Sequence, residues 1–314
     1  MSSRQRIAII GAGIAGLACA RRLRDAGLDL EIFDKGRKAG GRASTRYVTS
    51  GIQFDHGAQY FTARSPAFNS VLENMLSSGA AARWDDGSEK PHFVGIPGMN
   101  SLAGFLGRDL DIHQSTEVAA IRRTRDGWAV DTGADKRQFD VVVITIPVPQ
   151  IIGLLGQTSP LPRAVEGVSY EPCLTLMAAL EPISAPSFVT RADAEDPLAW
   201  IANDSSKPNR GTEACWVAQA NPLWSAEYLD TDHDAIAQMM LPMLCDRLSI
   251  TRAKVRYAAA HRWRYAKVSQ PLGEPFIRHT SGTLYAGGDW CLGARLEAAW
   301  TSGHCIAGDI LQSV

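Results

Sequence analysis

The sequence lacks the cysteine and histidine patterns that staple small secreted domains or hold metals. Its six cysteines contain no C-x-x-C pair, and its seven histidines show no metal-ligand spacing with them. Neither a disulfide framework nor a metal site is therefore indicated. We expect buried or incidental thiols in a protein of the reducing cytoplasm, at positions Cys19, Cys173, Cys215, Cys245, Cys291 and Cys305.

An excess of charge of one sign is also missing, and so are long hydrophobic runs. The 32 basic and 33 acidic residues leave a net charge of −1, which creates no field to recruit nucleic acid or an anionic membrane. Residues 1–6 are polar and glycines interrupt the apolar stretch after them, so we expect neither a secretory segment nor a membrane-spanning helix. The oligomeric state is left open.

The composition that is present is ordinary for a globular protein. Hydrophobic residues make up 45% and charged residues 21% of the 314 positions, as in typical soluble domains. A chain of this length predicts about two domains and is long enough to bury a substantial core.

A glycine-rich turn after the first apolar run organises the chain. Residues 7–10 are apolar, as expected of a strand buried on both faces of a parallel sheet. Gly11, Gly13 and Gly16 follow with the spacing of a dinucleotide fingerprint. The first allows a tight turn, the second lets the backbone approach a pyrophosphate, and the third lets the next helix pack closely. That helix presents free N–H groups to the phosphates.

A second strand, residues 30–33, ends at Asp34, an acid placed to accept hydrogen bonds from a ribose. Strand, glycine turn, helix, strand and acid in this order predict a dinucleotide site, with a purely structural strand–turn–helix as the alternative. The predicted cofactor-binding residues here are Gly11, Ala12, Gly13, Ile14, Ala15, Gly16, Phe33, Asp34 and Lys35.

Gly40-Gly41-Arg42 indicates a flavin site rather than a nicotinamide site, since a minimal NAD-binding fold needs no second glycine pair and arginine at this position. The arrangement resembles the flavoprotein superfamily that includes amine oxidases, protoporphyrinogen oxidases and phytoene desaturases. The resemblance implies non-covalently bound FAD, with Gly40 and Gly41 along it and Arg42 near its diphosphate. A solvated surface arginine after a flexible turn is the alternative.

Residues 55–64, DHGAQYFTAR, narrow the resemblance. A Gly-Ala pair at the end of an aromatic-rich strand suits a backbone that passes close to a flat ring, although a simple turn would look similar. The phrase resembles the renalase family, a small branch of the amine-oxidase-like flavoproteins. That resemblance implies that Ala58, Gln59 and Tyr60 lie near the flavin ring.

The middle of the chain alternates predicted strands and helices. Glu117 and Val118 are expected to start a strand, and the resemblance implies that Val118 meets the adenine. Pro242 should end or kink the clearest helix. The expected helices are residues 66–79, 101–106 and 234–248, and the expected strands are residues 128–131, 141–146, 174–180, 200–203 and 214–220, with a β-rich excursion over 84–98.

A strand over residues 258–268 carries the candidate substrate-binding side chains. Alternation places His261, Trp263 and Tyr265 on one face and Arg262 and Arg264 on the other. The aromatic face could hold a flat substrate while the arginines meet phosphate, or it could be a core face opposite a solvated basic one. The resemblance favours the substrate role.

The closing stretch, residues 284–311, resembles the C-terminal FAD motif of the superfamily. The resemblance implies that Asp289 contacts the pyrophosphate–ribityl region and that the start of the last helix faces flavin oxygens. Trp290 joins His261, Trp263 and Tyr265 as a catalytic candidate, and a thioether at Cys291 is a weaker alternative. The cofactor residues implied here are Gly288, Asp289, Arg295, Leu296 and Ala299.

These motifs predict an α/β fold that contains a two-dinucleotide-binding, Rossmann-like FAD domain and a β-sheet-rich substrate domain, with the chain crossing between them. The FAD domain is expected to be discontinuous. Its segments are residues 1–60, 98–148 and 280–314, and the substrate domain is formed by 61–97 and 149–279.

The renalase resemblance implies an activity. It is the oxidation of 2- and 6-dihydro isomers of NAD(P), with hydride transfer to flavin N5 and reoxidation by O2 to give H2O2. A flavin-containing amine oxidase is the main alternative, although residues 173–180 contain no lysine to hold a water near N5. A flavin-binding protein without turnover is the third possibility.

Overall fold

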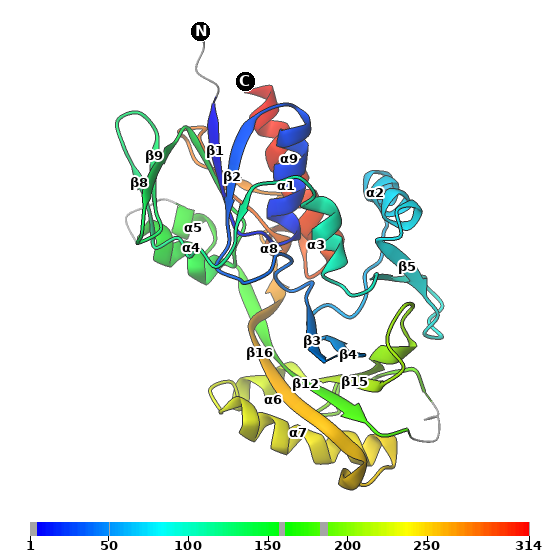
Figure 1. The fold of residues 1–314 in the computed structure, drawn as a ribbon. Helices are drawn as coiled ribbons and strands as arrows, with labels where there is room; N and C mark the ends of the chain where they lie inside the picture. The colour runs from blue at the N-terminus through cyan, green and yellow to red at the C-terminus, as the bar shows by residue number, and fades with distance from the viewer. Residues whose placement is uncertain (1–4, 50, 157–160, 183–187, 314) are drawn as a thin grey trace.

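A six-stranded sheet, with strand order β17-β18-β11-β1-β2-β7, forms the nucleotide-binding half of the molecule (Figure 1). The computed structural model describes residues 5–49, 51–156, 161–182 and 188–313. The strands of this sheet are β1 (Arg6–Ile10), β2 (Asp29–Phe33), β7 (Ile112–His113), β11 (Val141–Ile144), β17 (Ile277–Arg278) and β18 (Leu284–Ala286). All adjacent pairs are parallel except β17 with β18.

The sheet is covered on both faces, because successive residues of β1 enter different cores. Ile7 and Ile9 pack with helices α1 (Ile14–Asp25) and α9 (Leu296–Gln312). Ala8 and Ile10 pack on the other face, against a three-stranded antiparallel sheet and helix α4. The elements of that second layer are β8 (Ala120–Arg123), β9 (Trp128–Asp131), β10 (Lys136–Phe139), α4 (Val148–Leu155) and α5 (Leu161–Ala164).

A five-stranded antiparallel sheet, with order β13-β14-β15-β12-β16, forms the other half. Helices α6 and α7 cover one of its faces, and a hairpin of β3 and β4 lies on the opposite face (Figure 1). The elements are β3 (Thr45–Thr49), β4 (Ile52–Asp55), β12 (Ser169–Leu180), β13 (Thr190–Ala192), β14 (Trp200–Asn203), β15 (Ala214–Gln219), α6 (Pro222–Glu227), α7 (His233–Leu248) and β16 (Val255–Gln270).

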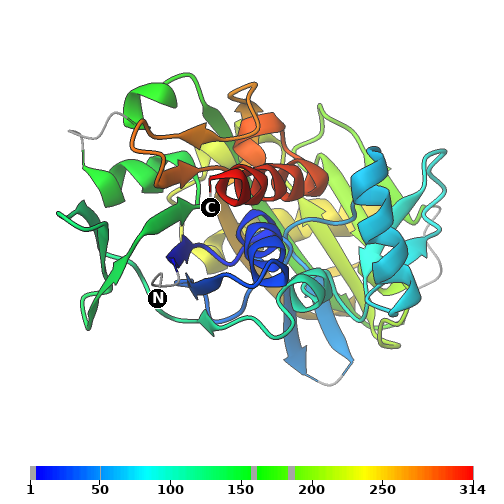
Figure 2. The same cartoon turned by 90° about the horizontal axis from the view of Figure 1, so that it is seen from above.

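The remaining elements connect the two halves. In Figure 2, α2 and its neighbouring hairpin stand at one end of the molecule, away from α4 and α5. The connecting elements are α2 (Pro66–Ser77), β5 (Ala81–Trp84), β6 (His92–Gly95), α3 (Ser101–Leu106) and α8 (Asp289–Leu292). Within the described residues, no helix has both the length and the hydropathy to cross a bilayer.

The α/β class and the Rossmann-like layout are confirmed. Pro242 was expected to end or kink its helix; it does not end α7, which continues to Leu248 and packs its apolar side against the five-stranded sheet, and the kink stays a prediction. The strand expected at Glu117 starts at Ala120, since ladder pairing with β9 begins only there, and Val118 is buried in the core beside it.

The domain boundaries stay a prediction, and the sheets refine where the crossings fall. Strand β17 pairs with β18, so the chain returns to the nucleotide-binding sheet before residue 280. Helix α4 packs on the core of that sheet, although residues 149–155 had been assigned to the substrate domain. The hairpin β3–β4 packs on the five-stranded sheet although it precedes residue 60.

Candidate active site and cofactor-binding region

The two glycine motifs of the first 42 residues lie against each other. Gly13 and Gly40 form a β-bridge, and the N–H of Gly40 donates to the carbonyl of Ala12 at 2.9 Å. Gly11 has a φ of 103°, which a side chain would strain. A Cβ on Gly16 would lie 2.0 Å from the carbonyl oxygen of Gly11, so only glycine lets α1 start so close to β1.

Asp34 holds this glycine loop in place. One carboxylate oxygen accepts the N–H of Ala12 and the other accepts the N–H of Gly36, each at 2.6 Å. An ionised carboxylate has about four acceptor positions, so two of them stay available to ribose hydroxyls. The predicted ribose contact of Asp34 is therefore compatible with its backbone role.

Helices α1 and α9 run side by side in the same direction, with a stagger between their starts. Gly303 of α9 touches the backbone of Ala15, and further along Arg22 donates to the carbonyl of His304 at 2.8 Å. Since Ala15 begins α1 whereas Gly303 lies in the middle of α9, the start of α9 projects about 9 Å beyond that of α1. Two positive helix ends therefore lie along one line, which suits the diphosphate and the flavin ring of a single extended cofactor.

FAD can fit beside these helix ends only if protein atoms leave the space open, and they do. A Cβ built on Gly13 would meet no atom within 4 Å, and one on Gly41 would meet only Gly13. Neither α1 nor α9 has a side-chain cap, unlike α2, α6 and α7. The short helices α3 and α4 also lack a side-chain cap, so a missing cap does not by itself indicate a cofactor site. At α1 and α9 the open glycine surface beside the helix start is the feature that does. The residues present fit a dinucleotide.

Arg42 and Asp289 join the two ends of the chain. The guanidinium of Arg42 pairs with the Asp289 carboxylate at 2.6 Å and donates to the carbonyls of Tyr265 and Ala266 at 3.2 and 3.0 Å. The GGR segment, the C-terminal motif and β16 therefore meet at one point. Arg42 is not a solvated surface side chain.

The segment predicted to pass the flavin, residues 56–60, has its backbone fixed from several sides. The carbonyl of His56 accepts the indole N–H of Trp263, and that of Gly57 accepts the amide of Gln219, each at 2.8 Å. The N–H of Ala58 donates to the carbonyl of Arg42 at 2.9 Å. A segment held in this way offers a rigid surface rather than a simple turn.

The five-stranded sheet presents a row of side chains to this segment. Trp200 pairs with Gln219, Gln219 with Thr175, and Thr175 with His261, on four neighbouring strands. Directly opposed residues of a sheet share a face, and the bond from Gln219 to Gly57 shows that this face looks toward residues 56–60. The row therefore forms one wall of the candidate site.

The His261 end of the row is an aromatic cluster of neutral imidazoles. The His261 ring lies 4.7 Å from that of His56 and 4.3 Å from that of Trp263. Burial, together with the nearby charge of Arg46, lowers the pKa of His56 to about 4. Burial, His56 and Arg46 lower the pKa of His261 to about 3. Both rings are uncharged at neutral pH, so they offer hydrogen bonds and contact area but no positive charge.

At the Trp200 end, Tyr60 stacks on His92 with ring centroids 3.6 Å apart and lies 5.7 Å from Trp200. Asp86 accepts from Nδ1 of His92 at 2.9 Å. Burial raises the pKa of Tyr60, and Asp86 raises it further. Tyr60 is thus a neutral phenol in an aromatic setting.

A buried ionic cluster supports the same segment, and sequence reasoning missed it. Lys207 donates to Asp204 at 2.5 Å and to Asp55 at 3.1 Å, and Arg210 donates to Asp55 at 2.5 Å. These side chains are at most 1% exposed. Burial would raise the pKa of Asp55, but the two cations outweigh it and the pKa is lowered. We call Asp55, Asp204, Lys207 and Arg210 the ionic quartet.

The quartet reaches the candidate site through Gln59. Lys207 donates to Oε1 of Gln59 at 3.5 Å, while the amide nitrogen of Gln59 donates to the carbonyls of Asp55 and Gly57. The sequence alone does not link these residues, because 152 positions separate Lys207 from Asp55 and no local pattern relates them. Lys207 is thus held between the carboxylates of Asp55 and Asp204.

Several predicted residues lie away from the row. Trp290 is 1% exposed and packs in a core cluster beside Gly288, and its catalytic role stays a prediction. Tyr265 packs against Tyr170 with centroids 5.6 Å apart. Phe33 stacks on His113 at 5.0 Å. Ile14 begins α1, and Arg295, Leu296 and Ala299 lie at the start of α9. Lys35 follows Asp34, and Val118 is buried in the core on the other face of the sheet. The contacts of these six residues to FAD stay predictions.

The two arginines expected to meet phosphate have other partners. Arg262 donates to the carbonyl of Leu229 at 2.5 Å and lies 3.3 Å from His233. Arg264 pairs with Asp230 at 2.6 Å. Both therefore tie β16 to the start of α7.

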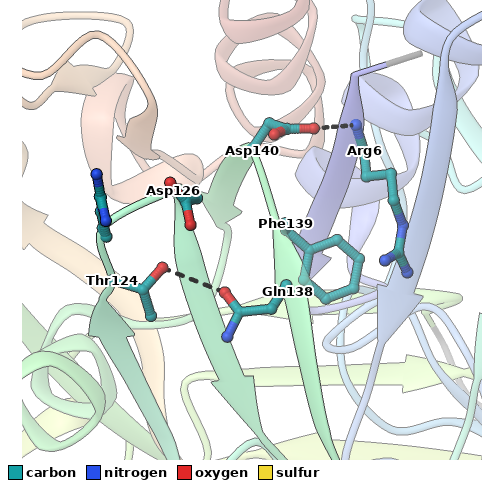
Figure 3. Close-up of a pocket in the computed structure, with 7 residues that line it drawn as sticks. Arg6, Thr124, Asp126, Gln138, Phe139 and Asp140 are labelled. Carbon is teal, nitrogen blue, oxygen red and sulfur yellow. Dashed lines mark hydrogen bonds between the residues drawn. The ribbon is translucent and has the colours of Figure 1, made fainter. Parts of the chain in front are cut away.

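A surface pocket of about 540 Å³ lies elsewhere (Figure 3). Arg6, the first residue of β1, and the neighbouring Phe139 and Asp140 line it. Ligands of parallel α/β sheets bind at the carboxyl ends of the strands, and this pocket lies at the opposite end. It is separate from the cofactor region.

Comparison with known proteins agrees with this layout. A model of NAD(P)-binding Rossmann-like domains matches residues 9–75, and one of flavin containing amine oxidoreductases matches residues 75–311. Renalase of Mus musculus is 26% identical over 318 residues, which span 90% of this chain and 92% of that protein.

Two solved structures share the fold. A protein from Exiguobacterium sp. 255-15, provisionally named a protoporphyrinogen oxidase, superposes with a TM-score of 0.81 at 15% identity, covering 99% of this chain and 100% of that one. Cyclohexylamine oxidase from Brevibacterium oxydans IH-35A superposes with a TM-score of 0.77 at 12% identity, covering 99% of both chains. At these identities the likeness concerns the fold alone.

Proposed function

The chain belongs to the flavin-containing amine oxidoreductase family, as a renalase-like FAD-dependent oxidoreductase, and from this premise we propose that its donors are 2- and 6-dihydro isomers of NAD(P). The products would be NAD(P)+ and H2O2, with O2 as the electron acceptor. Similarity to renalase along nearly the whole chain supports this choice of donor. The free state of all six cysteines supports a cytoplasmic location.

The charge of the candidate site is the observation that carries the choice between donors. His56 and His261 are neutral, and the cations Arg46 and Arg262 act on His261. An amine reaches an enzyme mainly as an ammonium ion, which the two arginines repel, whereas a dihydronicotinamide dinucleotide carries a neutral ring and anionic phosphates. The charge pattern therefore favours the dinucleotide.

The chemistry divides between the cofactor and the chain. Bound FAD accepts two electrons with the hydride and returns them to O2. The chain has no proton to remove from a heteroatom of such a donor, because its product is an aromatic cation. The fixed segment 56–60 and the row from Trp200 to His261 would instead hold the ring flat and exclude water. Neutral imidazoles at His56 and His261 suit that positioning role.

Anaerobic mixing of the holoenzyme with separated 2-, 4- and 6-dihydro-NAD(P) tests the proposal. We expect rapid loss of the flavin's visible absorbance with the 2- and 6-isomers, and equal yields of NAD(P)+ and H2O2 once O2 is admitted. Benzylamine and putrescine serve as the competing donors. Bleaching by an amine alone would identify an amine oxidase, and no bleaching by any donor would indicate a flavoprotein without this turnover.

A further inference from the structure

Arg46 lies on the face of the β3–β4 hairpin that packs on the five-stranded sheet. Its cross-strand partner Phe54 stacks on Tyr257 of β16, with ring centroids 5.8 Å apart. Two residues before Arg46, the hydroxyl of Ser44 lies 3.1 Å from Nε2 of His56. Two residues after it, Val48 packs on the small core that also contains Ala259. Side chains two apart on a strand share a face, so Arg46 lies between these contacts.

The same spacing on β16 places Arg46 beside His261. Tyr257 and Ala259 oppose the far end of the hairpin face, and Trp263 meets the His56 end. His261 lies between them on β16, as Arg46 does on β3. The electrostatic effect of Arg46 on both His56 and His261 agrees with this placement.

Arg46 differs from the neighbouring arginines because nothing pairs with it. Arg42, Arg210, Arg256 and Arg264 each bind a carboxylate. In the described parts of the chain, no hydrogen-bond or ion-pair partner contacts Arg46, although its side chain is half-buried. A guanidinium stays charged in proteins, and partial burial without a counterion is unfavourable. The position is therefore suited to an anion supplied from outside.

We propose that Arg46 binds a phosphate group of the substrate, at the edge of the row that ends at His261. This inference rests on the proposed function, because a dihydronicotinamide dinucleotide brings its phosphates attached to the ring that meets the flavin. Strand β16 is the edge strand of its sheet, so a substrate whose ring lies over residues 56–60 can extend past it. A guanidinium recognises phosphate through paired, charge-assisted hydrogen bonds.

The phosphate that Arg46 binds is distinct from that of FAD. The cofactor diphosphate is predicted at Gly13 and Arg42, where the two glycine motifs meet. Arg46 lies four positions further along, against β16 and not against α1. Loss of Arg46 should therefore leave the FAD content of the purified protein unchanged.

Steady-state kinetics with graded donors test the inference. The donors are the borohydride-made dihydro forms of nicotinamide riboside, nicotinamide mononucleotide, NAD and NADP. For Arg46→Met we expect KM for the mononucleotide and dinucleotides to rise about 10- to 100-fold, as for the loss of a charge-assisted contact, with kcat unchanged. The riboside KM should stay within about twofold. Arg46→Lys should restore part of the loss.

Arg256→Met is the matched control, since Arg256 lies on β16 but pairs with Glu213. It should leave every KM unchanged. A rise limited to NADP would support the inference and identify the 2′-phosphate as the group bound. Equal rises for the riboside and the phosphorylated donors, or lower FAD content, would overturn it while the proposed function stands. Failure of all four donors to reduce the wild-type flavin would overturn the proposed function, and this inference with it.

Discussion

The cofactor region and the substrate wall are built in opposite ways. Around the predicted FAD, the chain offers backbone: glycines, two uncapped helix ends and one acid that holds the loop. Along the five-stranded sheet it offers side chains: imidazoles, indoles, amides and the ionic quartet. The first region is therefore sensitive to any added atom, whereas the second is sensitive to any group removed.

This difference also separates local from distant determinants. Each glycine motif depends on a few neighbouring residues, although Gly40 meets Gly13 only after α1 and β2, and Asp289 completes the region from the other end of the chain. The quartet joins β4 to the loop after β14, and its members pair only because the fold brings these two segments together. Substitutions in the glycine motifs should therefore impair the cofactor region and leave the substrate wall intact, and substitutions in the quartet should do the reverse.

The largest effect is expected from Gly16→Ala. The added Cβ would lie 2.0 Å from the carbonyl oxygen of Gly11, and rigid backbone cannot yield as a flexible side chain does. Helix α1 must move away from β1, so we expect the purified protein to contain almost no FAD. Flavin absorbance and the melting temperature of the apoprotein measure this.

Gly13→Ala is the matched control for that change. Its Cβ would meet no protein atom within 4 Å, so the apoprotein should melt as the wild type does, while FAD affinity falls because the methyl group occupies space meant for the cofactor. If Gly13→Ala and Gly16→Ala destabilise the apoprotein equally, the distinction between a packing glycine and a cofactor glycine is wrong.

The next effect is expected from Lys207→Met in the substrate half. Asp55 and Asp204 would then share the single cation Arg210 in a fully buried setting. Breaking a buried ion pair from one side costs about 3–5 kcal/mol of unfolding free energy. Denaturant unfolding of the apoprotein measures the loss.

A charge-balanced variant sharpens the result. Asp204→Asn together with Lys207→Met removes one charge of each sign, so most of the lost stability should return. Asp55 keeps Arg210 in this variant. If the double variant is as unstable as Lys207→Met, uncompensated charge is not the cause, and packing around Trp84 and Gln59 must be.

The smallest effect is a pH dependence that belongs to the wall. The folded pKa values of His56 and His261 lie near 4 and 3, below the ordinary value for histidine. Protons therefore bind the unfolded chain first, and stability present above about pH 6.5 is lost as the pH falls toward these values. Between about pH 7 and pH 5 we expect a loss of about 2 kcal/mol for each histidine.

The charges facing the pair are Arg46, Arg262 and His233, which lower the pKa values, and Asp55, which raises that of His56. Denaturant unfolding of the apoprotein at several pH values measures the loss. In His261→Phe the loss should be about half as large. An unchanged pH profile in that variant would show that His261 is not held neutral.

Prediction from sequence succeeded where function follows from short-range pattern. The Gly11–Gly13–Gly16 turn forms as its local sequence predicts, and it meets the GGR segment, which in turn pairs with Asp289. The contacts of these residues to FAD stay predictions. The strand over residues 258–268 is confirmed within β16, with His261 and Trp263 in contact. Pro242 shows the limit of such rules, since burial of the apolar side of α7 outweighs one missing hydrogen bond.

Sequence could not assign the partners of charged side chains. Arg262 and Arg264 are expected from the sequence to meet phosphate, yet they pair with Leu229 and Asp230. No sequence pattern marks Arg46, which has no pairing partner among the described residues. Trp290 is 1% exposed, which the sequence did not indicate, and its place in the substrate pocket stays a prediction.

The amino-acid order by itself determined the nucleotide-binding layout, the family and the use of FAD, because glycine spacing and strand–helix alternation act over a few residues. Only the tertiary structure decided which side chains face the substrate and which charges neutralise one another. Those outcomes depend on pairings between residues more than 100 positions apart, such as Lys207 with Asp55. Electrostatic energy in a protein depends on distance and burial rather than on order along the chain.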